Sequence, residues 1–154
     1  MVKEFKVTPI KNGTVIDHIE KGMALKVLKI LGITGKQESI VSVAMYVDSG
    51  KDHINKKDIV KVEDRELDPH ELNKIALIAP SATFNIIRNY NVWKKHKVEL
   101  PEIIEGIVQC GNPNCVSNKK EPVVSKCVVF SKDPLRLKCY YCDREQTDIV
   151  GHII

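Results

Sequence analysis

The sequence predicts an α+β protein with an N-terminal antiparallel sheet and two helices on one face of it, followed in the sequence by a small all-β four-cysteine domain. Strand-like and helix-like segments alternate over the first hundred residues. All five cysteines lie between Cys110 and Cys142. Leu100-Pro101 precedes a change of composition towards Cys, Gly, Pro and Asn. We therefore expect two domains, residues 1–100 and residues 103–154.

The first three elements come from short patterns near the N-terminus. Phe5–Ile10 and Thr14–Ile19 are β-prone runs separated by Lys11-Asn12-Gly13, and Asn-Gly favours a tight turn. The segment KGMALKVLKILG then carries apolar residues at helical spacing, and Gly32 is placed to end that helix. This pattern predicts two strands followed by one helix.

The middle of the domain reads as two strands joined by a polar connection. Ile40–Val47 places alternate apolar residues on one side of a strand, and Asp58–Glu63 has the same period. The intervening segment Asp48–Lys56 is polar and contains Gly50, which predicts a loop.

The second helix has the clearest boundaries in the chain. Asp68 is a good N-cap, Pro69 suits the first helical position, and Pro80 ends the apolar stripe. Ala82–Arg88 and Val92–Val98 follow as extended segments. The order of elements implies a mostly antiparallel sheet with both helices on one face.

Composition and charge narrow the class of function. Hydrophobic residues make up 43% and charged residues 29% of the 154 positions, which is typical of a globular chain. The net charge is +4, but the part after residue 100 holds seven basic and seven acidic residues. A mild basic excess confined to the first domain suits a phosphorylated small molecule better than a nucleic acid. We therefore expect no nucleic-acid partner.

No segment of the sequence is long and apolar enough to cross a membrane, which would need about 18–20 residues. The N-terminus also lacks the apolar stretch and cleavage site of a signal peptide. We expect a cytoplasmic protein with no membrane partner.

The cysteines form two closely spaced pairs, Cys110-x4-Cys115 and Cys139-x2-Cys142. Two such pairs separated by a long loop bring four thiolates to one tetrahedral ion, and zinc suits such a ligand set best. Four thiolates leave no open coordination position, so we expect one structural Zn²⁺ per chain. The competing interpretation is ordinary buried cysteines or a redox pair. Cys127 lies outside both pairs and is expected to be a packed thiol.

Several polar residues of the first domain share a chemistry that suits a triphosphate. His18, Lys57, Lys61 and Lys95 offer cationic donors, and Asp17 can accept from ribose hydroxyls. The competing interpretation is that they are solvated surface residues. Phosphate-binding glycine loops, nucleophile elbows and metalloprotease motifs are all absent from the sequence, so we expect no catalytic activity.

Three segments of the first domain carry a resemblance to a known family. They are GTVIDHI at residues 13–19, KKDIVKVE at residues 56–63 and ALIAPSATFNIIRNYNV at residues 76–92. Together with the four-cysteine pattern, and in this order, the sequence closely resembles the aspartate carbamoyltransferase regulatory chain. The resemblance covers essentially the whole chain.

The resemblance implies a non-catalytic regulatory subunit that controls pyrimidine biosynthesis. Its N-terminal allosteric domain would bind CTP or ATP, with UTP as a further candidate, and would join two chains through its sheet into a regulatory dimer. Its zinc domain would dock onto the catalytic chain, so that three regulatory dimers link two catalytic trimers. The alternative is a stand-alone zinc-ribbon adaptor or RNA-binding protein.

The resemblance also implies roles for particular residues. Contacts to the base and ribose would come from Ile10, Asp17, Lys61, Asn85, Tyr90 and Val92. Contacts to the phosphates would come from His18 and Lys95, with Lys57 close by. Contacts to the catalytic chain would come from Asn112 and Asn114. Two departures stand out: Pro9 lies in the effector-binding strand, and Lys94 competes with Lys95 for the phosphate.

Overall fold

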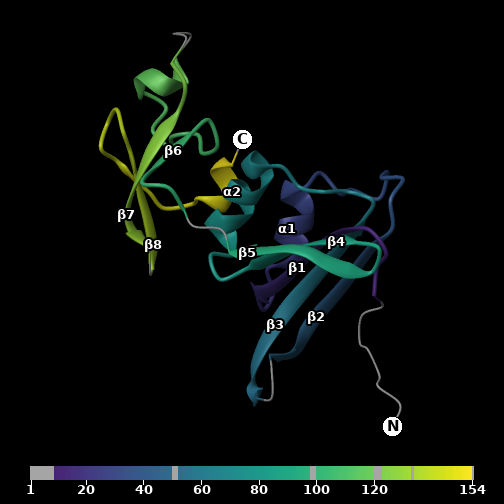
Figure 1. Ribbon diagram of the computed structural model, residues 1–154. Helices are drawn as coiled ribbons and strands as arrows, with labels where there is room; N and C mark the ends of the chain where they lie inside the picture. The colour runs from purple at the N-terminus through teal and green to yellow at the C-terminus, as the bar shows by residue number, and fades with distance from the viewer. Residues whose placement is uncertain (1–8, 50–51, 98–99, 120–122, 133, 154) are drawn as a thin grey trace. The chain divides into compact units, whose positions relative to one another are not determined.

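The computed structural model describes residues 9–49, 52–97, 100–119, 123–132 and 134–153 (Figure 1). The chain divides into two units, residues 1–98 and 99–154, each with its own sheet and its own core.

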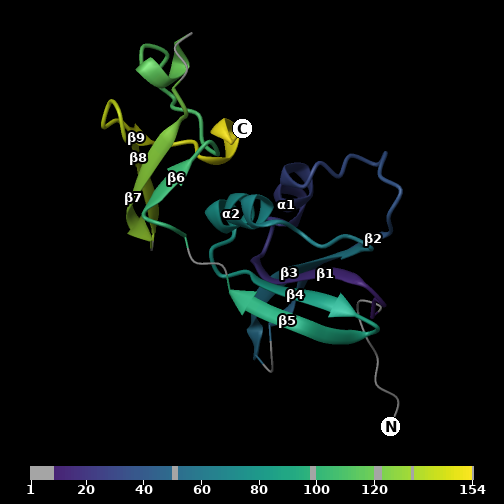
Figure 2. The same cartoon turned by 45° about the horizontal axis from the view of Figure 1, so that its top comes forward.

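The first unit is a five-stranded antiparallel sheet with two helices on one face (Figures 1 and 2). The strands, which lie in the order β2-β3-β1-β4-β5, are β1 (Gly13–Glu20), β2 (Val41–Ser49), β3 (Asp52–Glu63), β4 (Thr83–Arg88) and β5 (Asn91–Lys97). The helices are α1 (Ala24–Ile30) and α2 (Pro69–Ile78). The predicted α+β architecture of this domain is confirmed.

The core of the first unit lies between the sheet and the helices. Ile16 of the central strand β1 pairs in register with Val60 of β3 and with Phe84 of β4. Residues opposite one another in antiparallel strands point to the same face, so these three side chains form one buried row. Ile75 of α2 is buried as well. The face that carries Ile16 is therefore the helix-covered face.

The ends of α2 follow the sequence signals. The Asp68 carboxylate accepts a hydrogen bond from the Glu71 N–H at 2.9 Å, and Pro69 occupies the first helical turn. Helix α1 is shorter than predicted and has no side-chain cap from its own N-cap residue. Gly32 follows it at φ +73°, a conformation that glycine adopts without strain.

A buried carboxylate replaces the missing cap of α1. Asp58 of β3 is 0% exposed, and its side chain accepts hydrogen bonds from the N–H groups of Gly22 at 2.9 Å and Ala24 at 3.1 Å. The same carboxylate accepts the Tyr46 N–H at 2.9 Å from strand β2. Asp58 thus joins the start of α1 to two neighbouring strands.

The predicted loop between the two middle strands and the end of the predicted first strand both differ from the structure. The predicted loop Asp48–Lys56 is wrong, because β2 continues to Ser49 and β3 already begins at Asp52. Its polar residues are compatible with a strand because β2 lies at the edge of the sheet, where one side of the ladder is solvated. Residues 5–8 of the predicted first strand lie outside the described residues, and residues 9 and 10 are not in a strand.

The expected alternation in β2 is also interrupted. The register with β3 shifts between Ala44 and Val47, and Tyr46 adopts φ +60° within this bulge. Val43 and Met45, predicted to share one side of the strand, are exposed. The bulge inserts an extra residue and turns the side chains that follow it to the other face, whereas Val43 precedes the bulge, pairs with Val60 and is exposed at the edge of the sheet.

The second unit is a small all-β domain, as predicted. Its sheet has the order β6-β7-β8-β9 and consists of β6 (Ile103–Glu105), β7 (Lys126–Lys132), β8 (Leu135–Cys139) and β9 (Glu145–Gln146). Two short 3-10 turns flank it, η1 (Val116–Asn118) and η2 (Val150–His152). Its apolar core is small, which suits a domain that depends on a metal cross-link.

Among the described residues the longest helix has ten residues, and none of the helices could cross a membrane.

Candidate anion pocket and metal centre

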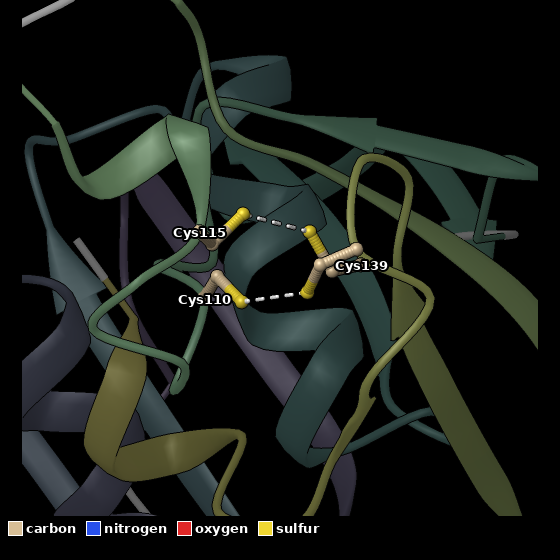
Figure 3. A group of neighbouring side chains, drawn as sticks. Cys110, Cys115 and Cys139 are labelled. Atoms are coloured by element: carbon tan, nitrogen blue, oxygen red, sulfur yellow. Dashed lines mark hydrogen bonds between the residues drawn. The ribbon is translucent and has the colours of Figure 1, made fainter.

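Four cysteine side chains of the second unit converge on one point. The sulfur atoms of Cys110, Cys115, Cys139 and Cys142 all lie within 4.8 Å of one another. The Cys115 and Cys139 sulfurs are 3.6 Å apart (Figure 3). The Cys110 and Cys142 sulfurs are 3.7 Å apart. Ligands about 2.3 Å from a tetrahedral ion would stand about 3.8 Å apart. The donor set therefore fits a four-coordinate, thiolate-bound ion.

Two tight turns, one for each cysteine pair, present these sulfurs. In the first turn the Cys115 N–H donates to the Asn112 carbonyl at 3.0 Å. In the second the Asp143 N–H donates to the Cys139 carbonyl at 3.0 Å, directly after strand β8. Each turn sets two thiols on the same side of the backbone, and folding of the sheet brings the two turns together.

Burial and hydrogen bonding shift the pKa values of Cys139 and Cys115 in opposite directions. Burial raises the pKa of Cys139 well above its ordinary value. For Cys115 burial acts in the same direction, but hydrogen bonds from Ser117, Cys139 and Cys142 outweigh it and lower the pKa to about 7. A bound cation would favour the thiolate forms of its ligands.

Cys127 is not part of this group. It pairs in register with Cys139 on the neighbouring strand, is buried, and has its pKa raised to about 11, chiefly by burial. A neutral thiol packed in the core agrees with the prediction made from its position in the sequence.

A cavity of about 610 Å³ opens at one end of the five-stranded sheet. Four lysines and two histidines line it, against a single carboxylate. The lining residues are His18, Ile19, Glu20, Ser49, Lys56, Lys57, Ser81, Thr83, Lys95, His96 and Lys97. Such an excess of cationic donors suits a polyanionic ligand.

A bulge in the central strand places His18 in this cavity. The register between β1 and β3 shifts between Ile16 and Ile19, and His18 adopts φ +57°. Its Nδ1 lies 3.1 Å from the Thr83 hydroxyl, and its carbonyl accepts a hydrogen bond from Ser81 Oγ at 3.2 Å. Bulges re-aim side chains in this way, and here the imidazole turns towards the lysines.

Asp17 already partners one of the cavity's lysines. The Lys57 ammonium lies 2.9 Å from the Asp17 carboxylate, and the His18 N–H also donates to Asp17 at 2.7 Å. An anionic ligand would compete with Asp17 for Lys57. The Asp17 carboxylate could in turn accept hydrogen bonds from hydroxyl groups of the ligand.

A row of polar residues crosses the sheet beside the cavity. Lys61 of β3, Asn85 of β4 and Lys95 of β5 are aligned in register through Val15 of β1. Val15 neighbours Ile16, which faces the helices, so the row lies on the opposite face. Burial lowers the pKa of Lys61, and the nearby Asp17 carboxylate opposes this shift.

The register also separates Lys95 from Lys94. Lys95 is paired with Asn85, lies on the face of the polar row and lines the cavity, whereas Lys94 is paired with Ile86 and does not line it. A register shift at Trp93 produces this arrangement. Lys95 is thus the lysine placed beside His18 and Lys57.

The remaining residues expected to touch a base lie at the other end of the sheet. Tyr90 and Val92 are exposed near the β4–β5 turn, and the Tyr90 N–H donates to the Lys11 carbonyl at 2.9 Å. Ile10 is only 5% exposed, so little of this residue is accessible to a ligand. The expected phosphate contacts and base contacts therefore fall into two groups at opposite ends of β1, with Lys61 and Asn85 between them.

Sequence reasoning missed several lining residues of the cavity. Lys97 lies two positions after Lys95 on the same strand, and this period-two spacing is a signal that could have identified it. Lys56 was assigned to a loop, and Ser81 and Thr83 approach His18 only through tertiary folding.

The two asparagines expected to contact a partner lie on the first cysteine turn. The Asn112 side-chain oxygen accepts the Asn114 N–H at 3.0 Å, and the Asn118 side chain donates to the Asn112 carbonyl at 2.7 Å. Asn112 therefore shapes the turn, whereas Asn114 is exposed on its outer side.

Each of the two units matches a family model. Residues 5–99 match the model of the aspartate carbamoyltransferase regulatory chain, allosteric domain, and residues 102–150 match the metal binding domain of the same chain.

Similar whole proteins carry the same name, aspartate carbamoyltransferase regulatory chain. One from Methanothrix thermoacetophila is 55% identical over 152 residues, which cover 99% of this chain and 97% of the relative. Another from Pyrococcus horikoshii is 53% identical over 153 residues, which cover 97% and 99%. A third from Korarchaeum cryptofilum is 53% identical over 156 residues, covering 99% and 98%. The chain belongs to the family of aspartate carbamoyltransferase regulatory chains, and is a non-catalytic subunit with an allosteric domain followed by a metal-binding domain.

Proposed function

We propose that the first domain binds nucleoside triphosphate effectors, CTP and ATP, with UTP as a further candidate. The observation that carries this proposal is the cavity in which His18, Lys57 and Lys95 come together with further lysines. Charge-assisted hydrogen bonds from ammonium and imidazole groups suit phosphate oxygens, and the cavity is large enough for several phosphate groups. The stand-alone RNA-binding alternative gains no support from this local, one-ended concentration of charge.

The ligand would lie along β1, with its phosphates in the cavity and its base near Tyr90. Between these ends, Asp17 and Lys61 are placed to contact the ribose, and Asn85 extends the polar row. The Val92 and Ile10 contacts would be made at the base end, where Ile10 precedes Lys11, the backbone hydrogen-bond partner of Tyr90. This orientation follows from the separation of the two groups of residues.

For the second domain we propose one structural Zn²⁺ held by Cys110, Cys115, Cys139 and Cys142. The sulfur distances fit a tetrahedral thiolate site, and four protein ligands would leave no open position for chemistry. The ion would supply a cross-link between two turns that are 23 residues apart in the sequence. This cross-link would provide much of the stability of a domain with so small a core.

We further propose that the chain acts within an assembly in the cytoplasm that controls pyrimidine biosynthesis. Two chains would pair through the sheet of the first domain, where edge strand β2 exposes Val43, Met45 and Tyr46. The metal-binding domain would contact the catalytic chain through the turn that carries Asn112 and Asn114, so that regulatory dimers link catalytic trimers. The family name of the relatives supports the association with a catalytic partner.

Calorimetric titration of the full chain with CTP, ATP and UTP tests the effector proposal. Lys95→Ala should weaken triphosphate binding, whereas the matched control Lys94→Ala, on the other face of the same strand, should change it little. Cytidine should lose less affinity than CTP in the Lys95 variant, because only a phosphate contact is removed. Equal effects of the two substitutions would contradict the proposed site.

A further inference from the structure

Gln146 is a buried polar residue of the metal-binding domain that lies next to the cysteine cluster without being a ligand. It belongs to the two-residue strand β9 and is 6% exposed. Long polar side chains are seldom buried unless their hydrogen-bonding groups are satisfied. The partners of its amide group therefore indicate what it does.

The Gln146 amide contacts both cysteine turns. Its Oε1 accepts the Gly111 N–H at 2.8 Å in the first turn. Its Nε2 donates to the Arg144 carbonyl at 2.9 Å, just after the second turn, and lies 3.6 Å from the Cys110 sulfur. Gly111 and Cys110 are 35 and 36 residues away in the sequence, so this contact is purely tertiary.

The orientation of this amide is determined by its partners. The Gly111 N–H can only donate and the Arg144 carbonyl can only accept, so the oxygen must face Gly111 and the nitrogen must face Arg144. The Nε2 group therefore directs an N–H, rather than a lone pair, towards the Cys110 sulfur.

We propose that Gln146 is a positioning residue for the metal centre, which clamps the first cysteine turn against the second and donates a hydrogen bond to the Cys110 thiolate. Four thiolates carry more negative charge than one divalent ion neutralises, so N–H donors to sulfur stabilise the ligated state. The backbone N–H of Asn112 already donates to the same sulfur at 3.4 Å. Gln146 adds a second donor and holds Cys110 near Cys142 at 3.7 Å.

The test measures zinc retention by the full chain. Gln146→Met removes both polar groups at similar volume, and Gln146→Glu keeps the acceptor for Gly111 but replaces the donor by a carboxylate oxygen. The matched control is Gln37→Met, because Gln37 also accepts a glycine N–H, from Gly35 at 2.9 Å, but belongs to the first unit, whereas all five cysteines belong to the second. Zinc release to an excess of chelator at pH 8 would be followed alongside competition between Zn²⁺ and the chelator at equilibrium.

Both Gln146 variants should bind Zn²⁺ roughly 10–100-fold more weakly than wild type, the usual effect of removing a group that supports a metal ligand. Gln37→Met should match the wild type. In Co²⁺-substituted protein the thiolate-to-metal charge-transfer band should shift in both Gln146 variants, which a purely structural role elsewhere in the domain would not produce. Triphosphate binding by the first domain should remain unchanged.

Two outcomes would overturn the inference. Unchanged zinc affinity in both variants would show that Gln146 does not support the site, and a loss confined to Gln146→Met would show that only the Gly111 contact matters. If Gln146→Met fails to fold, the isosteric Gln146→Glu variant still decides between these results. The inference rests on the proposed zinc site, and a wild-type chain that binds no Zn²⁺ would refute that proposal instead.

Discussion

Replacing Asp58 with alanine should strongly destabilise the first domain. This carboxylate is fully buried and accepts three backbone N–H groups, from Gly22, Ala24 and Tyr46, at 2.9–3.1 Å. Two of these groups lie at the start of α1, whose N-cap residue, Met23, makes no capping hydrogen bond with its side chain. The substitution would therefore leave the buried N–H of Ala24 without an acceptor, and it would remove the acceptor of the partly buried N–H groups of Gly22 and Tyr46.

The magnitude follows from the number of donors. The buried donor of Ala24 costs about 1–3 kcal/mol when it is left without a partner, each hydrogen bond lost at the two partly buried donors costs about 0.5–1.5 kcal/mol, and relief from burying a carboxylate offsets part of the sum. We expect a loss of about 2–4 kcal/mol in the free energy of unfolding, which is a large share of the ~5–15 kcal/mol typical of a domain. Asp58→Asn keeps one acceptor oxygen and the side-chain shape, so its loss should be smaller.

Urea denaturation followed by fluorescence provides the assay, because the single tryptophan, Trp93, lies in strand β5 of the same domain. Asp48→Ala serves as the control, since it removes a carboxylate at a partly exposed position, where it pairs with Lys56. A loss below about 1 kcal/mol for Asp58→Ala, or an equal effect of Asp48→Ala, would refute the reasoning that the buried acceptor holds α1 in place.

Three further predictions concern the two sites and α2. Lys95→Ala and His18→Ala should each lower triphosphate affinity by about tenfold or more, because a charge-assisted contact contributes about 1.5–3 kcal/mol and about 1.4 kcal/mol corresponds to a tenfold change in affinity. Calorimetric titration with CTP measures this loss. Unchanged affinity in both variants would mean that His18 and Lys95 are solvated surface residues. Cys115→Ser should abolish zinc binding and release the catalytic subunit, whereas Cys127→Ser should retain the metal; metal analysis showing the reverse would refute the ligand set. Backbone hydrogen bonding lowers the pKa of Asp68, so the contribution of this carboxylate to stability should be full above the pKa of the unfolded state and lost as pH falls through the lower pKa of the folded state. The urea midpoint of Asp68→Asn should therefore fall less than that of the wild type as the pH is lowered. An equal fall in both proteins would contradict this prediction.

Local signals in the sequence were sufficient for several features of this protein. The Asp68-Pro69 start of α2 and the two cysteine pairs depend on residues only a few positions apart, and such short-range geometry is fixed wherever the segment lies. The prediction of an α+β domain followed by a small all-β domain is confirmed for the same reason. The predicted roles of the nucleotide-contacting residues remain predictions.

Tertiary structure decided the features that depend on distant partners. The polar segment Asp48–Lys56 is mostly strand because the end of β2 and the start of β3 pair with each other, which composition does not reveal. The Trp93 bulge selects Lys95 over Lys94, since one extra residue reverses the face of every side chain that follows. Gln146 reaches Cys110 only when β9 is in place. Sequence patterns specify periodicity and local turns, whereas register and burial arise from contacts between segments far apart in the chain.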